Sequence, residues 1–163
     1  MPHPEIQQLL RLIDEAYDQK AWHGPNLRSS VRRLTAKEAA WRPGPGRHNI
    51  WEILIHAAYW KYAVHRRLRG DKRGSFSYKG SNWFPCPAPP TEKSWRADVA
   101  LLEQEHRQLR QTIATFPRAR LRERFRGARQ TPLDNIIGIA FHDVYHAGQI
   151  RVLRKLQEAR KRA

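Results

Sequence analysis

The segment 50–69 constrains the fold most, because its side chains are apolar around most of the circumference of a helix. Asn49 is a suitable N-cap, Glu52 stands three residues later as in a capping box, and Gly70 is a natural stop. Twenty residues form a helix of ~30 Å. A helix this long and this apolar points to an all-helical bundle.

Three further long segments show the three- and four-residue spacing of amphipathic helices. They are residues 4–20, 91–116 and 132–160. A short helical piece is expected at 26–34, and Thr35 and Glu38 fit a capping box for one more turn. The arginines of 118–129 alternate, which favours an extended segment. With no convincing strand pair, four long helices indicate an up-and-down four-helix bundle, and the length fits one domain over residues 1–163.

Between the second and third long helices, residues 71–90 are rich in proline and glycine and hold Trp83 and Phe84. Loops of this length inside a compact domain are uncommon and often functional. We therefore expect this loop to help shape a pocket. The one cysteine, Cys86, excludes an internal disulfide and a four-thiolate zinc site, and we expect an inert loop thiol.

Basic residues dominate the charge, with 31 Lys and Arg against 15 Asp and Glu and a formal net charge of +16. This excess favours a polyanionic partner without identifying one. No run of 18 apolar residues is present, so we expect no membrane span. The start of the chain, Met1 to Glu5, lacks the basic and apolar regions of a signal peptide, and we expect a cytoplasmic protein.

Three of the eight histidines lie in the two most apolar predicted helices. His142 and His146 are four residues apart and project from one helix face, ~6 Å apart along the axis. His56, midway along 50–69, can face this pair from a neighbouring helix of a bundle. Three nitrogens would leave a tetrahedral metal ion one open position, which is typical of a reactive site. The alternative is three buried, hydrogen-bonded side chains without a metal.

Two other classes of metal site do not fit. In 142–146 the histidine spacing is that of a zinc protease, but Asp143 replaces the glutamate base, and Gln149 and Val152 stand where the extended pattern needs glycine and histidine. Residues 103–106 contain one Glu-x-x-His pattern, whereas a di-iron bundle needs two such patterns and two more glutamates.

Several motifs together resemble the DinB-like superfamily of damage-inducible bundle proteins, over nearly the whole chain. They are Trp41-Arg42-Pro43, Gly46-x-His48-Asn49-Ile50-Trp51-Glu52 before His56, and His142-x3-His146-x-Gly148-Gln149-Ile150. The resemblance implies an up-down-down-up four-helix bundle, commonly dimeric, with a divalent metal held by His56, His142 and His146. Related proteins include thiol-dependent transferases and isomerases and others described as metal-dependent hydrolases.

We therefore predict a metal-dependent enzyme, a thiol-dependent transferase or hydrolase acting on a small molecule. It would hold Zn or Ni, with a low-molecular-weight thiol as a further cofactor, and form a homodimer. The alternative is a basic nucleic-acid-binding bundle with a structural metal or none. That alternative would use the basic clusters at 66–73, 118–129 and 151–162, with Trp83 or Phe84 for stacking. No helix-turn-helix, zinc finger or RNP motif supports it.

For residues near the predicted ligands, the sequence gives weaker indications of a role. Glu52 and Trp60 lie four residues to either side of His56; for Glu52 we favour a helix cap over an imidazole partner. Asp143 points ~100° away from His142, which favours a salt bridge on a solvent- or partner-facing side. Core packing is expected for Tyr59 and Tyr145, a surface position for His23 and His48, and no chemistry for His65 and His106.

Overall fold

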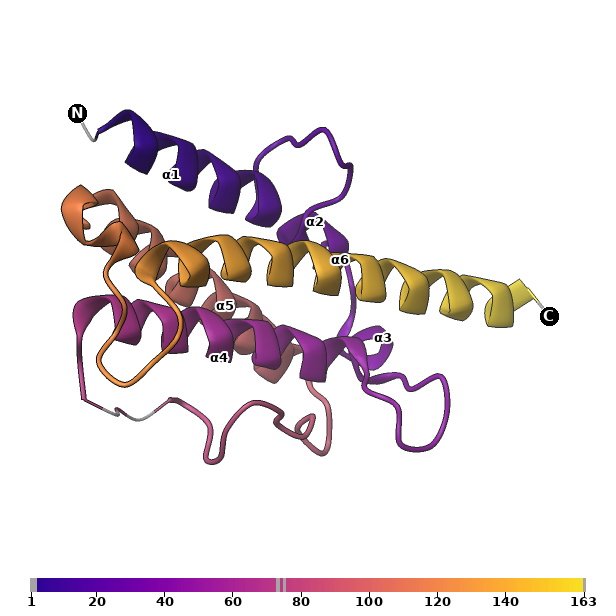
Figure 1. The fold of residues 1–163 in the computed structure, drawn as a ribbon. Helices are drawn as coiled ribbons and strands as arrows, with labels where there is room; N and C mark the ends of the chain where they lie inside the picture. Colours follow the sequence, from indigo (N-terminus) through magenta and orange to yellow (C-terminus); the bar gives the residue numbers. More distant parts are fainter. Residues whose placement is uncertain (1–2, 73, 75, 163) are drawn as a thin grey trace.

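The regular elements of the computed structural model are helices, in the described residues 3–72, 74 and 76–162 (Figure 1). They are α1 (Pro4–Tyr17), α2 (Leu27–Val31), α3 (Ala36–Ala40), α4 (Ile50–Arg69), α5 (Glu92–Ala114), the 3-10 helix η1 (Arg118–Arg122) and α6 (Pro132–Arg162). The prediction of an all-α fold is confirmed. Met1, Pro2 and Arg73, on which parts of the sequence interpretation rested, lie outside the described residues.

The four longest helices pack side by side (Figure 1). α4 contacts α5 and α6, and α1 contacts the same two helices, so the four surround a shared core. As predicted, the Asn49 side chain caps α4 by accepting a hydrogen bond from the Glu52 N–H at 2.8 Å. Gly70 ends the helix in the left-handed conformation, with φ of 73°. No helix in the described part of the chain is long and apolar enough to cross a membrane.

Two details of the sequence prediction are wrong. α1 ends at Tyr17 rather than near residue 20. The segment 118–129 is not extended throughout, because Arg118–Arg122 form η1. The helical turn places Leu121 fully inside the core, while Arg118 and Arg122 both reach the carboxylate of Glu5. The burial of Leu121 therefore favours a helical turn here, although the alternation of arginines in the sequence favours an extended segment.

The apolar circumference of α4 is explained by its position, because this helix contributes to both parts of the core. One part surrounds Trp51 and Leu54 and includes Trp95 of α5. The other surrounds Leu109 of α5 and Ile136 of α6. Burial of such side chains supplies ~25 cal/mol per Å² of apolar surface, which makes this two-part core the main support of the bundle.

A buried polar cluster interrupts the core where α1, α4, α5 and α6 meet. The Lys61 ammonium pairs with the Asp143 carboxylate, and both residues are 1% exposed. Lys61 Nζ also lies 3.4 Å from Nδ1 of His106, whose ring stacks on Tyr17 with centroids 3.8 Å apart. Asp143 therefore forms a salt bridge, as predicted, but the expected solvent- or partner-facing location is wrong. α6 packs against both α1 and α4, so a residue ~100° from His142 still faces the interior.

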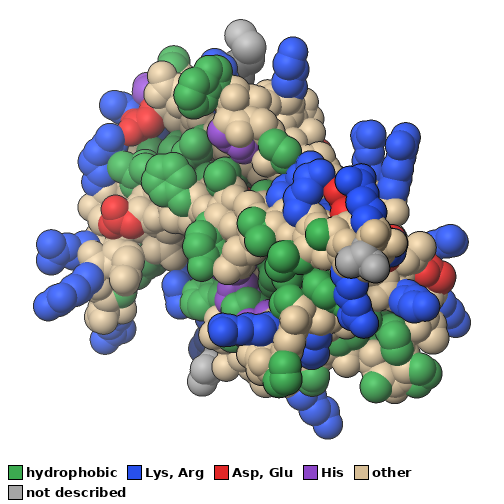
Figure 2. All heavy atoms as spheres, turned by 90° about the vertical axis from the view of Figure 1, so that its right-hand side faces the viewer, with side chains coloured by type: hydrophobic (Ala, Val, Ile, Leu, Met, Phe, Trp, Pro, Cys, Tyr) green, Lys and Arg blue, Asp and Glu red, His purple; other side chains and the backbone are tan. Residues whose placement is uncertain are grey.

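Lysine and arginine side chains are spread over several places rather than gathered in one. Figure 2 shows the face at the C-terminal end of α6, where they stand in separate groups with hydrophobic and histidine side chains between them. Several are engaged within the chain: Lys161 pairs with Glu38, and Arg154 donates to the Ser30 carbonyl. α6 also exposes large apolar side chains. They are Phe141, Tyr145, Val152 and Leu156.

A buried carboxyl on α5 makes stability depend on pH. Glu105 is 6% exposed, and its Oε2 atom is buried with no hydrogen-bond partner in the part of the chain that the structure describes. Burial raises the pKa of this carboxyl to about 7. The folded protein therefore holds this proton more tightly than the unfolded chain. The resulting contribution to stability is complete below the ordinary pKa of 4.5 and is lost as pH rises through about 7.

We expect Glu105→Gln to leave the free energy of unfolding nearly unchanged at pH 4.5 and to raise it by roughly 2 kcal/mol at pH 8, because glutamine stays neutral. Urea unfolding at a series of pH values measures the difference between variant and wild type. The exposed Glu123→Gln change is the control and should give no such difference. Equal effects of the two changes at pH 8 would contradict the interpretation.

Candidate metal centre

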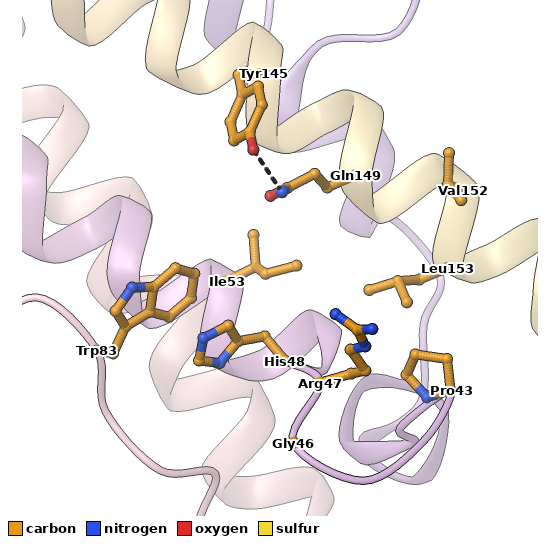
Figure 3. Close-up of a pocket in the computed structure, with 10 residues that line it drawn as sticks. All are labelled: Pro43, Gly46, Arg47, His48, Ile53, Trp83, Tyr145, Gln149, Val152 and Leu153. Carbon is orange, nitrogen blue, oxygen red and sulfur yellow. Dashed lines mark hydrogen bonds between the residues drawn. The ribbon is translucent and has the colours of Figure 1, made fainter.

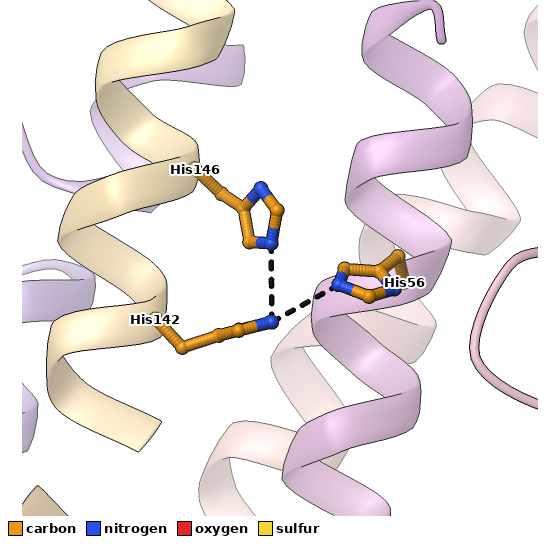
Figure 4. A group of neighbouring side chains, drawn as sticks. All are labelled: His56, His142 and His146. Carbon is orange, nitrogen blue, oxygen red and sulfur yellow. Dashed lines mark hydrogen bonds between the residues drawn. The ribbon is translucent and has the colours of Figure 1, made fainter. Parts of the chain in front are cut away.

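His56, His142 and His146 converge between α4 and α6 (Figure 4). His56 comes from the middle of α4, and the other two come from consecutive turns of α6. The Nε2 atom of His142 lies 3.0 Å from Nε2 of His56 and 3.1 Å from Nε2 of His146. His56 and His146 are buried and His142 is half-buried. The sequence prediction that these three side chains share one site in the interior is confirmed.

Hydrogen bonds at the opposite ring nitrogens orient two of the imidazoles. Nδ1 of His56 lies 2.7 Å from the carbonyl oxygen of Asn82, and Nδ1 of His146 lies 2.6 Å from Oε1 of Gln149. A carbonyl oxygen only accepts, so each Nδ1 carries the proton and donates. Each Nε2 is then left with a lone pair directed at the shared point. Metal-binding histidines are oriented in the same way by partners on their second nitrogen.

The three Nε2 atoms cannot satisfy one another by hydrogen bonds alone. His56 and His146 offer lone pairs there, and His142 carries at most one Nε2 proton, which can serve only one of its two neighbours. A cation at the shared point would accept all three lone pairs. Tetrahedral zinc with nitrogen ligands at ~2.0–2.1 Å places those nitrogens ~3.3 Å apart, close to the observed separations. The residues present therefore fit a divalent metal ion.

Burial keeps the three imidazoles neutral and able to bind a metal. Burial lowers the pKa of His56 to about 4, the Asn82 carbonyl acting in the opposite direction, and it lowers the pKa of His142 to about 3. The pKa of His146 is lowered for the same reason. Protons therefore do not compete for these nitrogens near neutral pH. The Nδ1 atom of His142 is buried and has no hydrogen-bond partner among the described residues.

Two residues of the 71–90 segment, Asn82 and Trp83, lie against His56, and Trp83 also lines a neighbouring cavity, in agreement with the expectation that this loop helps to shape a pocket. The Trp83 ring stacks on the His56 ring with centroids 3.9 Å apart and 9° between the planes. Trp60, on α4, donates from Nε1 to the Asn82 side chain at 2.9 Å and presents its edge to His142. These large rings, together with the Asn82 carbonyl, shield one side of the cluster from water.

Next to His146 and Trp83 lies an open cavity of about 580 Å³ (Figure 3). Residues from three parts of the chain line it, among them Arg47, His48, Ile53, Trp83, Tyr145 and Gln149. Gln149 joins the cavity to the histidine cluster, because it accepts from His146 and donates to the Tyr145 hydroxyl at 3.0 Å. The lining is largely apolar with a few polar groups, which is the usual character of a small-molecule site.

The predicted role of Glu52 as a capping-box side chain is wrong. Its backbone N–H binds Asn49, but its carboxylate accepts hydrogen bonds from Arg42 and from the Cys86 N–H and contacts His48. Because Glu52 is buried, its charge needs these partners, and the chain brings them from two loops that no helix periodicity could locate.

His48 is likewise not a plain surface residue, since it stacks on Trp83 and lines the cavity. Tyr145 is not packed in the core, being 63% exposed and bonded to Gln149. Burial raises the pKa of the Cys86 thiol, in agreement with the expectation of an inert cysteine. Lys61 is a buried charge that was not predicted from the sequence; its place among the apolar residues Tyr59, Trp60, Tyr62, Ala63 and Val64 was the available signal.

Residues 19–150 match the family model of the DinB superfamily. The chain belongs to this superfamily. The matched range includes all three clustered histidines, so the family assignment and the geometry of the site concern the same part of the molecule. No curated protein and no solved structure matches the chain.

Proposed function

We propose that this DinB superfamily member is a metal-dependent enzyme in which His56, His142 and His146 hold a divalent ion, Zn or Ni. The observation that carries the proposal is the convergence of three Nε2 atoms beside a cavity large enough for a small organic molecule. Three neutral nitrogen ligands suit either metal, and geometry and supply decide between them. Three ligands also leave a position open for a reacting group, as in catalytic zinc sites.

The bound metal would supply Lewis acidity and lower the pKa of a coordinated thiol or water. The residues of the chain do the rest. Asn82 and Gln149 fix the tautomers of two ligands, and the apolar lining of the cavity holds the body of the substrate. Arg47 reaches into the cavity (Figure 3) and can hold an anionic group of a substrate or thiol cofactor. The proposed reaction is thiol-dependent group transfer or hydrolysis.

The up-down-down-up order of the bundle is part of the same proposal. The connection of 20 residues between Gly70 and Thr91 supports it, because such a chain spans ~70 Å when extended and can return along a helix of ~30 Å. The homodimer, the cytoplasmic location and the alternative of a nucleic-acid-binding protein stay predictions.

Removing the metal tests the proposal. We expect purified protein to contain about one Zn or Ni per chain and to lose thermal stability when a chelator removes it. At free metal 100-fold above the dissociation constant, the folded state gains ~2.7 kcal/mol, which Zn or Ni added back should restore. Elemental analysis and thermal unfolding measure both effects. The loaded protein is then assayed with thiol-transferase and ester substrates.

A native protein without metal, whose stability is unchanged by chelator and by added Zn or Ni, would contradict the proposal. In that case the nucleic-acid alternative predicts binding of DNA or RNA that weakens steeply with salt and is unaffected by chelator.

A further inference from the structure

His48 occupies a defined position between the cavity and the histidine cluster. Its ring lines the cavity and stacks on Trp83, with centroids 3.7 Å apart and 5° between the planes. Trp83 also stacks on His56, and two rings at such distances must lie on opposite faces of the indole. His48 is thus separated from the predicted ligand His56 by the thickness of one aromatic ring. Its side chain is 46% exposed, so molecules in the cavity can reach it.

Glu52 determines which nitrogen of His48 is free. Nδ1 of His48 lies 3.0 Å from Oε2 of Glu52. Burial alone would raise the pKa of Glu52, but hydrogen bonds from Arg42, His48 and the Cys86 N–H lower it below its usual value, so the carboxylate is ionised and only accepts. Nδ1 therefore carries a proton and donates a hydrogen bond to the Glu52 carboxylate. The lone pair of neutral His48 is at Nε2, which makes no hydrogen bond within the described residues.

An imidazole held by a carboxylate on one nitrogen, with a lone pair on the other, has the arrangement of a general base. Arg42 strengthens the arrangement, because it binds both oxygens of Glu52 and keeps the carboxylate in place. The charged or titratable groups around His48 come from the surrounding loops and helices. They are Arg42, Arg47, Glu52, Cys86, Tyr145 and His146.

We propose that His48 is the proton acceptor for an organic thiol bound in the cavity, an inference that rests on the proposed metal-dependent function. The S–H bond breaks, its electron pair stays on sulfur, and the proton forms an N–H bond at Nε2 of His48. Glu52 and Trp83 are positioning residues that hold the ring. The cavity of about 580 Å³ with its largely apolar lining has room for the organic part of such a thiol.

The first test needs no metal and no activity. In wild-type protein at a pH where His48 is neutral, ¹⁵N NMR should show the proton of His48 on Nδ1, and Glu52→Gln should shift the population toward the Nε2–H form, because a glutamine amide can also donate to Nδ1. A His48 ring that carries its proton on Nε2 in the wild type would overturn the assignment.

The second test measures how many protons are released when benzyl mercaptan, used as the thiol probe, binds to the zinc-loaded protein. Calorimetric titrations in phosphate and Tris buffers at pH 8 give the number of protons released on binding. Wild type should release fewer protons per bound thiol than His48→Gln, because the imidazole retains a share of the thiol protons and a glutamine side chain can retain none. His23→Gln, at an exposed position, should behave like wild type.

Release of the same number of protons by wild type and His48→Gln, or no binding of the thiol to the loaded wild type, would overturn the proposal. Metal content is measured before each titration. A protein that binds no metal contradicts the proposed function, while one that binds metal but fails the proton count contradicts only the role of His48. The two failures are therefore distinguishable.

Discussion

Replacing His146 by alanine is expected to abolish stoichiometric metal binding. His146 supplies one of three converging nitrogens. With only two histidine ligands left, water would fill the other coordination positions of the ion. Loss of a partner behind a ligand already costs 10–100-fold in affinity, so we expect loss of the ligand itself to cost more than ~100-fold. Metal analysis after gel filtration and calorimetric titration with Zn measure the effect, and His142→Ala should behave in the same way.

Gln149→Leu is expected to weaken metal binding to a smaller extent than His146→Ala. It removes the acceptor that fixes the tautomer of His146 and leaves the three ligand nitrogens in place. We expect metal affinity to fall by about 10–100-fold without loss of the site. His23→Ala, on the exposed surface, is the matched control and should bind metal like wild type. Wild-type affinity in His146→Ala would contradict the metal centre.

Asp143→Ala is expected to cost ~3–5 kcal/mol of unfolding free energy. The change leaves the Lys61 ammonium unpaired at a position that is 1% exposed, where water cannot solvate it. Burial disfavours the ionised form of Asp143 and raises the pKa of this carboxyl to about 6. The Lys61 ammonium acts in the opposite direction and lowers this pKa. Urea unfolding at pH 7 measures the loss.

The double change Lys61→Met with Asp143→Leu separates the charge from the packing. With both charges gone and the volume filled, we expect stability to return to within ~1–2 kcal/mol of the wild type. Glu158→Ala, which breaks an exposed pair with Lys155, should cost at most ~1 kcal/mol. A loss from Asp143→Ala as small as that from Glu158→Ala would show that the buried pair does not support the bundle.

Much of the fold could be predicted because it depends on local rules. The start and end of α4 follow from an asparagine whose side chain caps the helix and a glycine that adopts a positive φ. α6 begins at Pro132, after the capping residue Thr131, as its sequence indicates. Each of these signals acts within four residues, and the structure confirms each.

The failed predictions for Asp143 and Glu52 concern contacts between different elements of the fold. Asp143 finds Lys61 across the bundle, and Glu52 finds Arg42 and the Cys86 N–H in two separate loops. Periodicity gives the direction in which a side chain leaves its helix, but it does not say which element lies there. The same limit explains Leu121, whose burial converts part of an alternating basic segment into η1.

The amino-acid sequence by itself determined the helical class of this chain, the two turns of α6 that carry His142 and His146, and the membership in the DinB superfamily that the family match confirms. The first two features depend on spacing along individual helices, which the 3.6-residue repeat dictates, and the third depends on motifs spread along the chain.

Only the tertiary structure decided that Nε2 of His56 lies 3.0 Å from Nε2 of His142, that Asn82 and Gln149 orient two of the rings, and that His48 stacks on Trp83 and contacts the Glu52 carboxylate. Such convergence depends on how helices and loops pack, because it joins atoms up to 86 positions apart along the chain.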